Sequence, residues 1–251
     1  MAAVRAGGAR LDELTFLSAM HRPGTVVDAG AHEGLLTLPL ARLPGARVLA
    51  FEPLPGAHAR LVAACAGLPN VACRAEALGG RSGGTLALSV PVLDGAEQSQ
   101  WASTAKDYAA FASERLSVAR HDVPVVALDD LALADVTAVK LDVEGGEYEA
   151  LRGARATLLR CRPVLTLELE ERHREGCTWA VPAYLDALGY AVRFALGGRW
   201  RTMGELDRAA MARASPDPSV FGGASDPYVF NFYAWPEERD AEARALLPGP
   251  S

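Results

Sequence analysis

The stretch Val26-Val27-Asp28-Ala29-Gly30-Ala31-His32-Glu33-Gly34 decides how this chain folds, together with Ala50-Phe51-Glu52-Pro53 further along. The first stretch is an apolar segment that ends in an acid and a glycine-containing turn, and the second is an apolar segment that ends in Glu52. With a helix between them, two such strands form the βαβ unit that holds a nucleoside at the carboxyl ends of its strands. The pair therefore predicts an α/β fold and an enzyme with a nucleoside-containing ligand.

The turn after the first strand indicates which nucleoside. A dinucleotide-binding loop has three glycines, so that a pyrophosphate can approach bare amides at the helix start. Here only Gly30 and Gly34 are present, and Glu33 would repel a phosphate. Asp28 suits a cationic or amino-bearing ligand, and Glu52 can accept hydrogen bonds from both ribose hydroxyls. S-adenosylmethionine fits this set. A glycine turn kept for packing alone is the alternative, but two acids at consecutive strand ends favour a ligand site.

Composition narrows the class of protein and its partners. A chain of 251 residues with 50% hydrophobic and 22% charged residues can form one large α/β core. The net charge of −6 argues against nucleic acid as a partner, because a phosphate backbone needs a basic face. No secretion signal or membrane-spanning run is recognisable, so the expected location is the cytoplasm, with a small molecule and no membrane as partner. The sequence leaves a homo-oligomer open.

Strands and helices alternate along the chain, which is typical of a parallel sheet covered on both faces. The predicted domain covers residues 24–236, with a helical extension at 1–23 that contains a helix at 10–20, and a frayed tail at 237–251. Residues 91–121 interrupt the alternation and contain a predicted helix at 105–118. A segment of this length indicates a lid or substrate loop, although a variable surface loop fits equally well. Residues 197–226 are expected to be irregular, before a last strand at 228–234.

The second informative stretch is Ala138-Val139-Lys140-Leu141-Asp142-Val143-Glu144-Gly145-Gly146-Glu147. In a strand, Lys140, Asp142 and Glu144 would point to one face, near the edge where open α/β sheets bind ligands. A structural ion pair of Lys140 with one of the two acids is the alternative, and it leaves the other acid unexplained. We interpret Asp142 and Glu144 as functional and Glu147 as a residue that complements a helix dipole.

A further strand at 163–169 is followed by Glu170 and His173. Glu168, near its end, should emerge beside Asp142 if strands that follow one another also pair. Asp142, Glu144 and Glu168 would then form an oxygen-rich cluster suited to Mg²⁺, or the same acids could bind a sugar. His121 and His173 are candidate bases, although a single histidine is more often structural.

Taken in their order along the chain, the stretches at 26–34, 50–53 and 138–147 resemble the motifs of the FkbM-type S-adenosylmethionine-dependent methyltransferases. The resemblance covers roughly residues 24–170. The most diagnostic part is Lys140-Leu141-Asp142-Val143-Glu144-Gly145. The resemblance implies a Rossmann-like class I methyltransferase fold, with a seven-stranded, mostly parallel sheet whose last strand is antiparallel. It also implies functional residues: for the cofactor Asp28, Gly30, Glu52, Asp142 and, near adenine, Glu76 and Ala77; for methyl transfer Asp142 and Glu144. His32 is a further candidate for cofactor binding and His173 for methyl transfer, but the resemblance does not imply either.

This chain departs from the family pattern at two positions. His32 stands where asparagine is frequent, and Glu170 stands where a histidine often follows the acid of the strand, with His173 close by. The resemblance implies O-methylation of a hydroxyl on a sugar or secondary metabolite. N-methylation, carboxyl methylation, a Rossmann protein that binds NAD or a nucleotide sugar, and a non-catalytic binding module remain alternatives. The last would leave Asp142 and Glu144 without a task.

Overall fold

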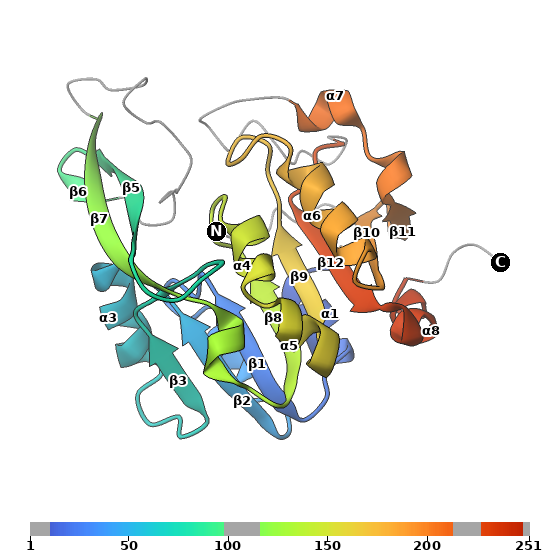
Figure 1. Cartoon of the computed structure of the whole chain (residues 1–251), viewed down its shortest axis with the longest axis horizontal. Coiled ribbons are helices and arrows are strands. Elements are labelled where there is room, and N and C mark those ends of the chain that lie inside the picture. Colours follow the sequence, from blue (N-terminus) through green and yellow to red (C-terminus); the bar gives the residue numbers. More distant parts are fainter. Residues whose placement is uncertain (1–10, 98–115, 213–226, 248–251) are drawn as a thin grey trace.

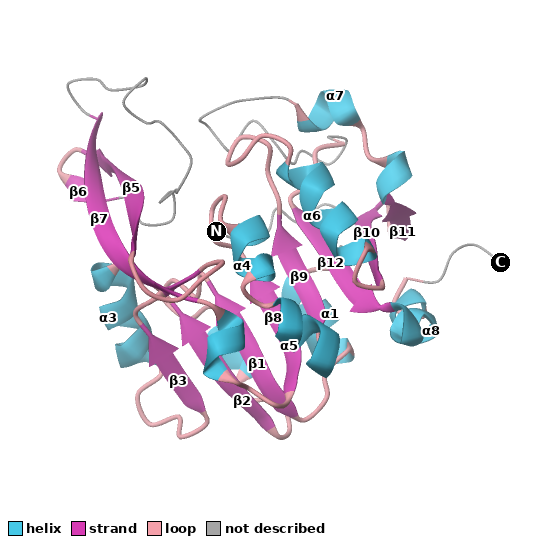
Figure 2. Cartoon of the chain, viewed as in Figure 1, coloured by secondary structure: helices cyan, strands magenta, loops and turns pink. Residues whose placement is uncertain are grey.

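The computed structural model describes residues 11–97, 116–212 and 227–247. Its main feature is a sheet of eight strands in the spatial order β11, β10, β12, β9, β8, β1, β2, β3, with helices on both faces (Figures 1 and 2). Along the chain these strands are β1 Gly24–Ala29, β2 Ala46–Phe51, β3 Val71–Arg74, β8 Val136–Leu141, β9 Val164–Glu168, β10 Tyr190–Leu196, β11 Arg199–Thr202 and β12 Asn231–Pro236.

The order of the strands confirms the predicted class I methyltransferase fold. Strands β3, β2, β1, β8 and β9 pair in parallel, and β12 runs antiparallel between β9 and β10. The sheet has one strand more than predicted, because β11 pairs antiparallel with β10 inside the segment that was expected to be irregular. The order of strands reverses between β1 and β8, and the crevice above such a point is where open α/β sheets bind ligands.

The helices divide into two layers. One core cluster packs α4 Glu147–Arg152, α5 Arg155–Cys161 and α6 Cys177–Asp186 on one face of the sheet. The other cluster packs the opposite face against α1 Glu13–Ala19, α2 Thr37–Leu40, part of α3 Pro55–Ala64, and α8 Asp240–Arg244. A short α7, Arg208–Met211, follows β11. No helix in the described ranges is both long and apolar enough to span a bilayer.

A smaller sheet stands beside the main one. It consists of β4 Ala77–Leu78, β5 Thr85–Leu93, β6 Ala96–Glu97 and β7 Leu116–Val126, and the β5–β7 hairpin projects above the main sheet in Figure 1. Its apolar side packs on the start of α3. The predicted helix at 105–118 is wrong at its last residues, because residues 116–118 belong to β7. The rest of that helix lies outside the described residues, as do residues 98–115 of the segment 91–121 predicted to be a lid or substrate loop; the described parts of that segment lie mostly in β5, β6 and β7.

Both ends of the described chain pack against the core. In the predicted extension, Phe16 and Met20 are fully buried, and the Tyr233 hydroxyl donates to the Leu11 carbonyl at 2.8 Å. The prediction of a frayed C-terminal tail is wrong for residues 237–247: Ala243 of α8 is buried, and its carbonyl accepts a 2.9 Å hydrogen bond from the Trp200 indole. Residues 11–23 and 237–247 are therefore part of the packed domain.

Candidate active site

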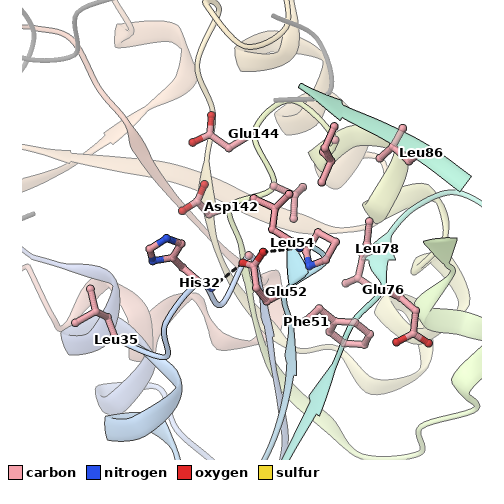
Figure 3. A pocket seen from close by; sticks show the side chains of 16 residues that line it. His32, Leu35, Phe51, Glu52, Leu54, Glu76, Leu78, Leu86, Asp142 and Glu144 are labelled. Atoms are coloured by element: carbon pink, nitrogen blue, oxygen red, sulfur yellow. Dashed lines mark hydrogen bonds between the residues drawn. The ribbon is translucent and has the colours of Figure 1, made fainter. Parts of the chain in front are cut away.

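A cavity of about 290 Å³ opens where β1, β2 and β8 end, between the main sheet and the base of the β5–β7 hairpin (Figure 3). The loops after these three strands supply most of its polar lining, and the hairpin adds an apolar wall. Seven of the residues predicted from sequence line it: Gly30, His32, Glu52, Glu76, Ala77, Asp142 and Glu144. The structure thus brings together, at one point, motifs that lie more than a hundred residues apart in the chain.

Gly30 lets two of the loops meet. Its φ is +74°, and a Cβ built at this position would lie 1.7 Å from the Asp142 carbonyl oxygen. The amides of Gly30 and Ala31 both donate to the Phe51 carbonyl, at 3.0 and 2.9 Å. Glycine is needed here because the backbone after β1 touches the backbone after β8, and a side chain would separate them.

Glu52 is held as an acceptor at the floor of the cavity. Its Oε2 accepts from the His32 amide and its Oε1 from the Leu54 amide, each at 2.9 Å (Figure 3). Burial raises the pKa of Glu52, and these two hydrogen bonds oppose the shift. A carboxylate has about four lone-pair sites, so each oxygen can still accept one hydrogen bond. Two adjacent hydroxyls, as in a ribose, would satisfy both.

Beside Glu52, the cavity becomes a mainly apolar slot. Phe51 and Leu78 line it from the main and smaller sheets, and Leu86 and Leu88 of β5 complete it. Glu76 lies at the rim in an ion pair with Arg74. The two leucines were not expected in the site, because their apolar pattern predicts only a strand, and their position in the cavity depends on how β5 packs beside the main sheet. A flat apolar slot of this kind suits a purine ring.

Asp28 differs from the other predicted cofactor residues, because its side chain is fully buried behind the cavity and does not line it. Its Oδ2 accepts a 2.6 Å hydrogen bond from the Thr37 hydroxyl at the start of α2. Its Oδ1 lies 3.7 Å from the Lys140 ammonium, which in turn lies 3.5 Å from Asp142 Oδ2. Asp28 therefore supports the wall of the site from within the sheet.

The expectation that Lys140, Asp142 and Glu144 share one face of a strand is wrong. Strand β8 ends at Leu141, and Glu144 has a φ of +53°, so the strand alternation does not continue. Lys140 stays buried in the sheet, while Asp142 and Glu144 reach the cavity from the following loop. Glu147 is structural, as expected, but in a different way from the helix-dipole role predicted for it: its buried side chain accepts 3.1 Å hydrogen bonds from the amides of residues 143 and 145 and so holds this loop.

His173 lies behind Glu144. Its Nε2 is 3.0 Å from Glu144 Oε2 and 3.5 Å from Glu170 Oε1, and its ring is almost completely buried. Burial alone would raise the pKa of Glu170, but the Arg172 guanidinium and His173 lower it below its ordinary value. The Tyr228 hydroxyl donates to the same carboxylate at 3.1 Å. Glu170 thus fixes a negative charge beside His173.

Two further predictions are not supported by the geometry. Glu168 does not line the cavity, and burial together with Asp142, Glu144 and Glu170 raises its pKa well above the ordinary value. Across residues 11–97, 116–212 and 227–247, no three His, Cys, Asp or Glu side chains are grouped so that they could hold a metal ion. The expected Mg²⁺ cluster of Asp142, Glu144 and Glu168 is therefore not formed. The other candidate base, His121, pairs with Glu97 at 2.9 Å on the hairpin and does not line the cavity.

One charged residue near the site was not predicted at all. Glu13 of α1 interacts with Lys140, Asp142 and Asp28 from the face of the sheet that α1 covers. Its Oε1 is buried and has no hydrogen-bond partner. An acid in the first turn of a helix usually interacts with the helix dipole at the surface, and no sequence signal distinguishes Glu13 from such a residue.

Comparison with known proteins identifies the family. The family model described as the methyltransferase FkbM domain matches residues 28–199. The chain belongs to the FkbM methyltransferase family. The cavity fits S-adenosylmethionine, the cofactor that this family membership implies: Glu52 has free acceptor sites for a ribose diol, and the slot beside it is apolar.

Solved structures show similar chains. The FkbM methyltransferase from Methylobacillus flagellatus KT is 16% identical, with a TM-score of 0.49, and the match covers 85% of this chain and 44% of that one. An rRNA methylase from Streptococcus thermophilus is 15% identical, with a TM-score of 0.43, and 73% and 85% of the two chains are covered. This chain therefore spans less than half of the FkbM structure. The comparison with curated protein sequences gave no match.

Proposed function

We propose that this FkbM methyltransferase methylates a hydroxyl group of a small molecule, either a sugar or a secondary metabolite. The observation that carries the proposal is the Glu144 carboxylate, which faces the cavity with His173 3.0 Å behind it. When bound, S-adenosylmethionine supplies an electrophilic methyl group, and transfer requires the acceptor oxygen to be aligned with it. An alcohol must also lose its proton, and a carboxylate within reach can take it.

The charges around Glu144 favour this acceptor over others. Asp142 and Glu144 line the cavity, Glu170 lies behind them, and the nearby cations Lys140 and Arg172 already pair with acids. A wall with excess negative charge repels carboxylate and phosphate acceptors. For the same reason, together with the net charge of −6, we propose a small molecule and not nucleic acid as the substrate.

An amine is the second candidate acceptor, because an anionic wall also suits a cation. It would arrive protonated and would need to lose that proton before transfer, so Glu144 and His173 could serve it as well. A Rossmann protein that binds NAD fits less well. Glu33 lies in the turn that leads into α2, in an exposed 2.6 Å ion pair with Arg60, where a pyrophosphate would need bare amides.

Two measurements test the cofactor and the acceptor separately. Calorimetric titration with S-adenosylhomocysteine and with NAD should show binding of the former only. Incubation with methyl-labelled S-adenosylmethionine and panels of sugars, polyols, amines and carboxylic acids should place the label on an oxygen in a bond that is stable to mild base. Label on nitrogen, or in a base-labile ester, would contradict the proposed acceptor.

The role of Glu144 is tested by Glu144→Gln. This variant should lose turnover by about 10² to 10⁴-fold, the usual contribution of a general base, while its affinity for S-adenosylhomocysteine stays near that of the wild type. Glu175→Gln changes an exposed acid of the loop that follows His173, and it should leave both properties unaltered. Full activity in Glu144→Gln would remove Glu144 from the mechanism.

A further inference from the structure

We propose that Lys140 is a positioning residue that holds the cofactor turn after β1 and the methyl-transfer loop after β8 in one arrangement. This inference rests on the proposed function, because both loops belong to the proposed site. The alternative is that Lys140 is only the counter-ion of the buried Asp28. The two roles differ in what they require of the side chain: a counter-ion needs only its charge, whereas a positioning residue also needs its donors in the right places.

The contacts of the Lys140 ammonium join the two loops. Its Nζ donates to the Gly30 carbonyl at 2.7 Å and to the Ala29 carbonyl at 3.2 Å. The same atom lies 3.5 Å from Asp142 Oδ2, on the other loop, and 3.7 Å from Asp28 Oδ1. An ammonium carries three protons. Two of them are donated to the Ala29 and Gly30 carbonyls, and both carboxylates lie within ion-pair distance of the same nitrogen.

The two loops are also in direct backbone contact, so a change in the position of one loop affects the other. The Asp142 amide donates to the Ala29 carbonyl at 3.2 Å, and the Asp142 carbonyl fills the place of a Gly30 side chain. Gly30 and Asp142 both line the cavity. A small shift at this junction would therefore move the turn that faces the cofactor and the acid beside the transferred methyl group together.

The charge of Lys140 is secured by its surroundings. Burial on its own would lower the pKa of this ammonium, but Asp142 and Asp28 outweigh it, with Glu13 of α1 and Glu168 of β9 contributing, and the pKa is raised. A lysine that stays charged keeps all three donors. The buried position would otherwise favour a neutral amine, which could not donate to both carbonyls and a carboxylate.

The choice of lysine is itself informative. The chain contains 25 Lys and Arg residues, and lysine occurs only at positions 106 and 140. An ammonium directs three donors from one atom, whereas a guanidinium is a planar fork of five. The Lys140 side chain is almost completely buried and its Nζ lies 2.7 Å from the Gly30 carbonyl, so a wider guanidinium would have to displace this turn. In a chain that otherwise uses arginine, lysine at this site matches a requirement for compact donors.

Three variants separate the two roles. Lys140→Met leaves Asp28 charged and buried, which can prevent folding on its own. The double variant Asp28→Asn/Lys140→Met removes both charges and so avoids that penalty. Lys140→Arg keeps the charge and changes the geometry. Arg47→Met serves as the matched control, because Arg47 pairs with Asp135 on the exposed side of the opposite end of the sheet.

The readouts are urea unfolding, calorimetric affinity for S-adenosylhomocysteine, and amide hydrogen exchange of residues 30–34 and 142–146 in the free protein. We expect the double variant to fold but to bind S-adenosylhomocysteine about tenfold or more weakly, with faster exchange in both loops together. Lys140→Arg should lose affinity as well, and Arg47→Met should bind as the wild type does.

Either of two results overturns the inference. One is a folded double variant that binds within about twofold of the wild type and keeps both loops protected, which would make Lys140 a counter-ion only. The other is wild-type affinity in Lys140→Arg, which decides the matter even if the double variant does not fold. If the wild-type protein itself fails to bind S-adenosylhomocysteine, the proposed function fails and this inference fails with it.

Discussion

Glu52 performs two tasks with one carboxylate. It ties the turn at His32 to the start of α3 through two backbone amides, and it keeps one acceptor site on each oxygen for the ligand. Because the side chain is almost completely buried, it cannot turn away to solvent when the cavity is empty. The acceptor is therefore already in place before the cofactor arrives, which lowers the entropy cost of binding.

Glu52→Gln tests this role. Glutamine has nearly the same shape, but its amide group can accept on one side only, so at least one ribose hydroxyl loses a charged acceptor. Hydrogen bonds to charged groups contribute about 1.5–3 kcal/mol, so the affinity for S-adenosylhomocysteine should fall about ten- to a hundredfold in calorimetry. Glu33→Gln, in the exposed pair with Arg60, should bind as the wild type does. Unchanged affinity in Glu52→Gln would mean that the ribose lies elsewhere.

Residues that directly follow strands were predictable, and those that act across the fold were not. Gly30, Glu52, Asp142 and Glu144 each follow a strand that was recognised from its apolar run, and parallel strands end at the same edge of a sheet. Asp28 was expected to hold the cofactor but lies behind the wall of the cavity, because sequence does not show the partners that bury a side chain. Glu13 was missed for the same reason.

At the scale of elements, α1 shows that a local pattern can predict a helix without predicting where the helix packs. Its amphipathic sequence predicted a helix, and the helix is present. Nothing local indicated that Phe16 would pack against β12, with its ring 5.0 Å from that of Tyr233 and 6.0 Å from that of Trp235. These contacts join residues more than two hundred positions apart, so α1 is tied to the last strand of the sheet.

Phe16→Ala should therefore destabilise the whole domain and not only detach a helix. Truncating a fully buried phenylalanine costs about 3–5 kcal/mol, through lost burial and the cavity that remains. Urea unfolding should show a single transition, with a free energy of unfolding that is lower by this amount. Thr15→Ala, on the exposed side of the same helix, should change the free energy of unfolding by well under 1 kcal/mol, as most surface substitutions do. A separate early transition in Phe16→Ala would show that α1 is an independent extension.

The β5–β7 hairpin and β11 were the elements that sequence predicted least well. The long strand β7 includes residues 116–118, which continue an alanine-rich stretch typical of a helix. Their pairing with β5 supplies hydrogen bonds that local propensity does not anticipate. Strand β11 is four residues long and follows two glycines, so its sequence is typical of a loop. Only its antiparallel pairing with β10 makes it a strand.

At the scale of the whole molecule, acids are concentrated inside the fold near one end of the sheet. Glu13, Asp28, Asp142 and Glu168 all act on the single ammonium of Lys140. A group of acids with too few cations can persist only if some of them are protonated. The stability of this protein should therefore depend on pH in a range where most carboxylates in proteins no longer titrate.

Glu13 provides the clearest test. Burial raises its pKa to about 7, against the attraction of Lys140, whereas in the unfolded chain the value is 4.5. Between these values the folded state binds more protons than the unfolded state, so stability falls as pH rises, and the loss is complete above about 7. The shift corresponds to a loss of about 3 kcal/mol at most. Glu147, whose pKa is also raised to about 7 by burial, adds a fall of the same sign.

Glu13→Gln removes the contribution of Glu13 to the pH dependence of stability and leaves that of Glu147. In urea unfolding at pH 5 and at pH 8, the variant should therefore gain stability relative to the wild type at the higher pH, and the difference between the two proteins should grow across that range. Glu33→Gln, at an exposed ion pair, should follow the wild-type pH dependence. Parallel pH profiles for the wild type and Glu13→Gln would show that Glu13 is ionised throughout, and that Lys140 compensates all of the acids around it.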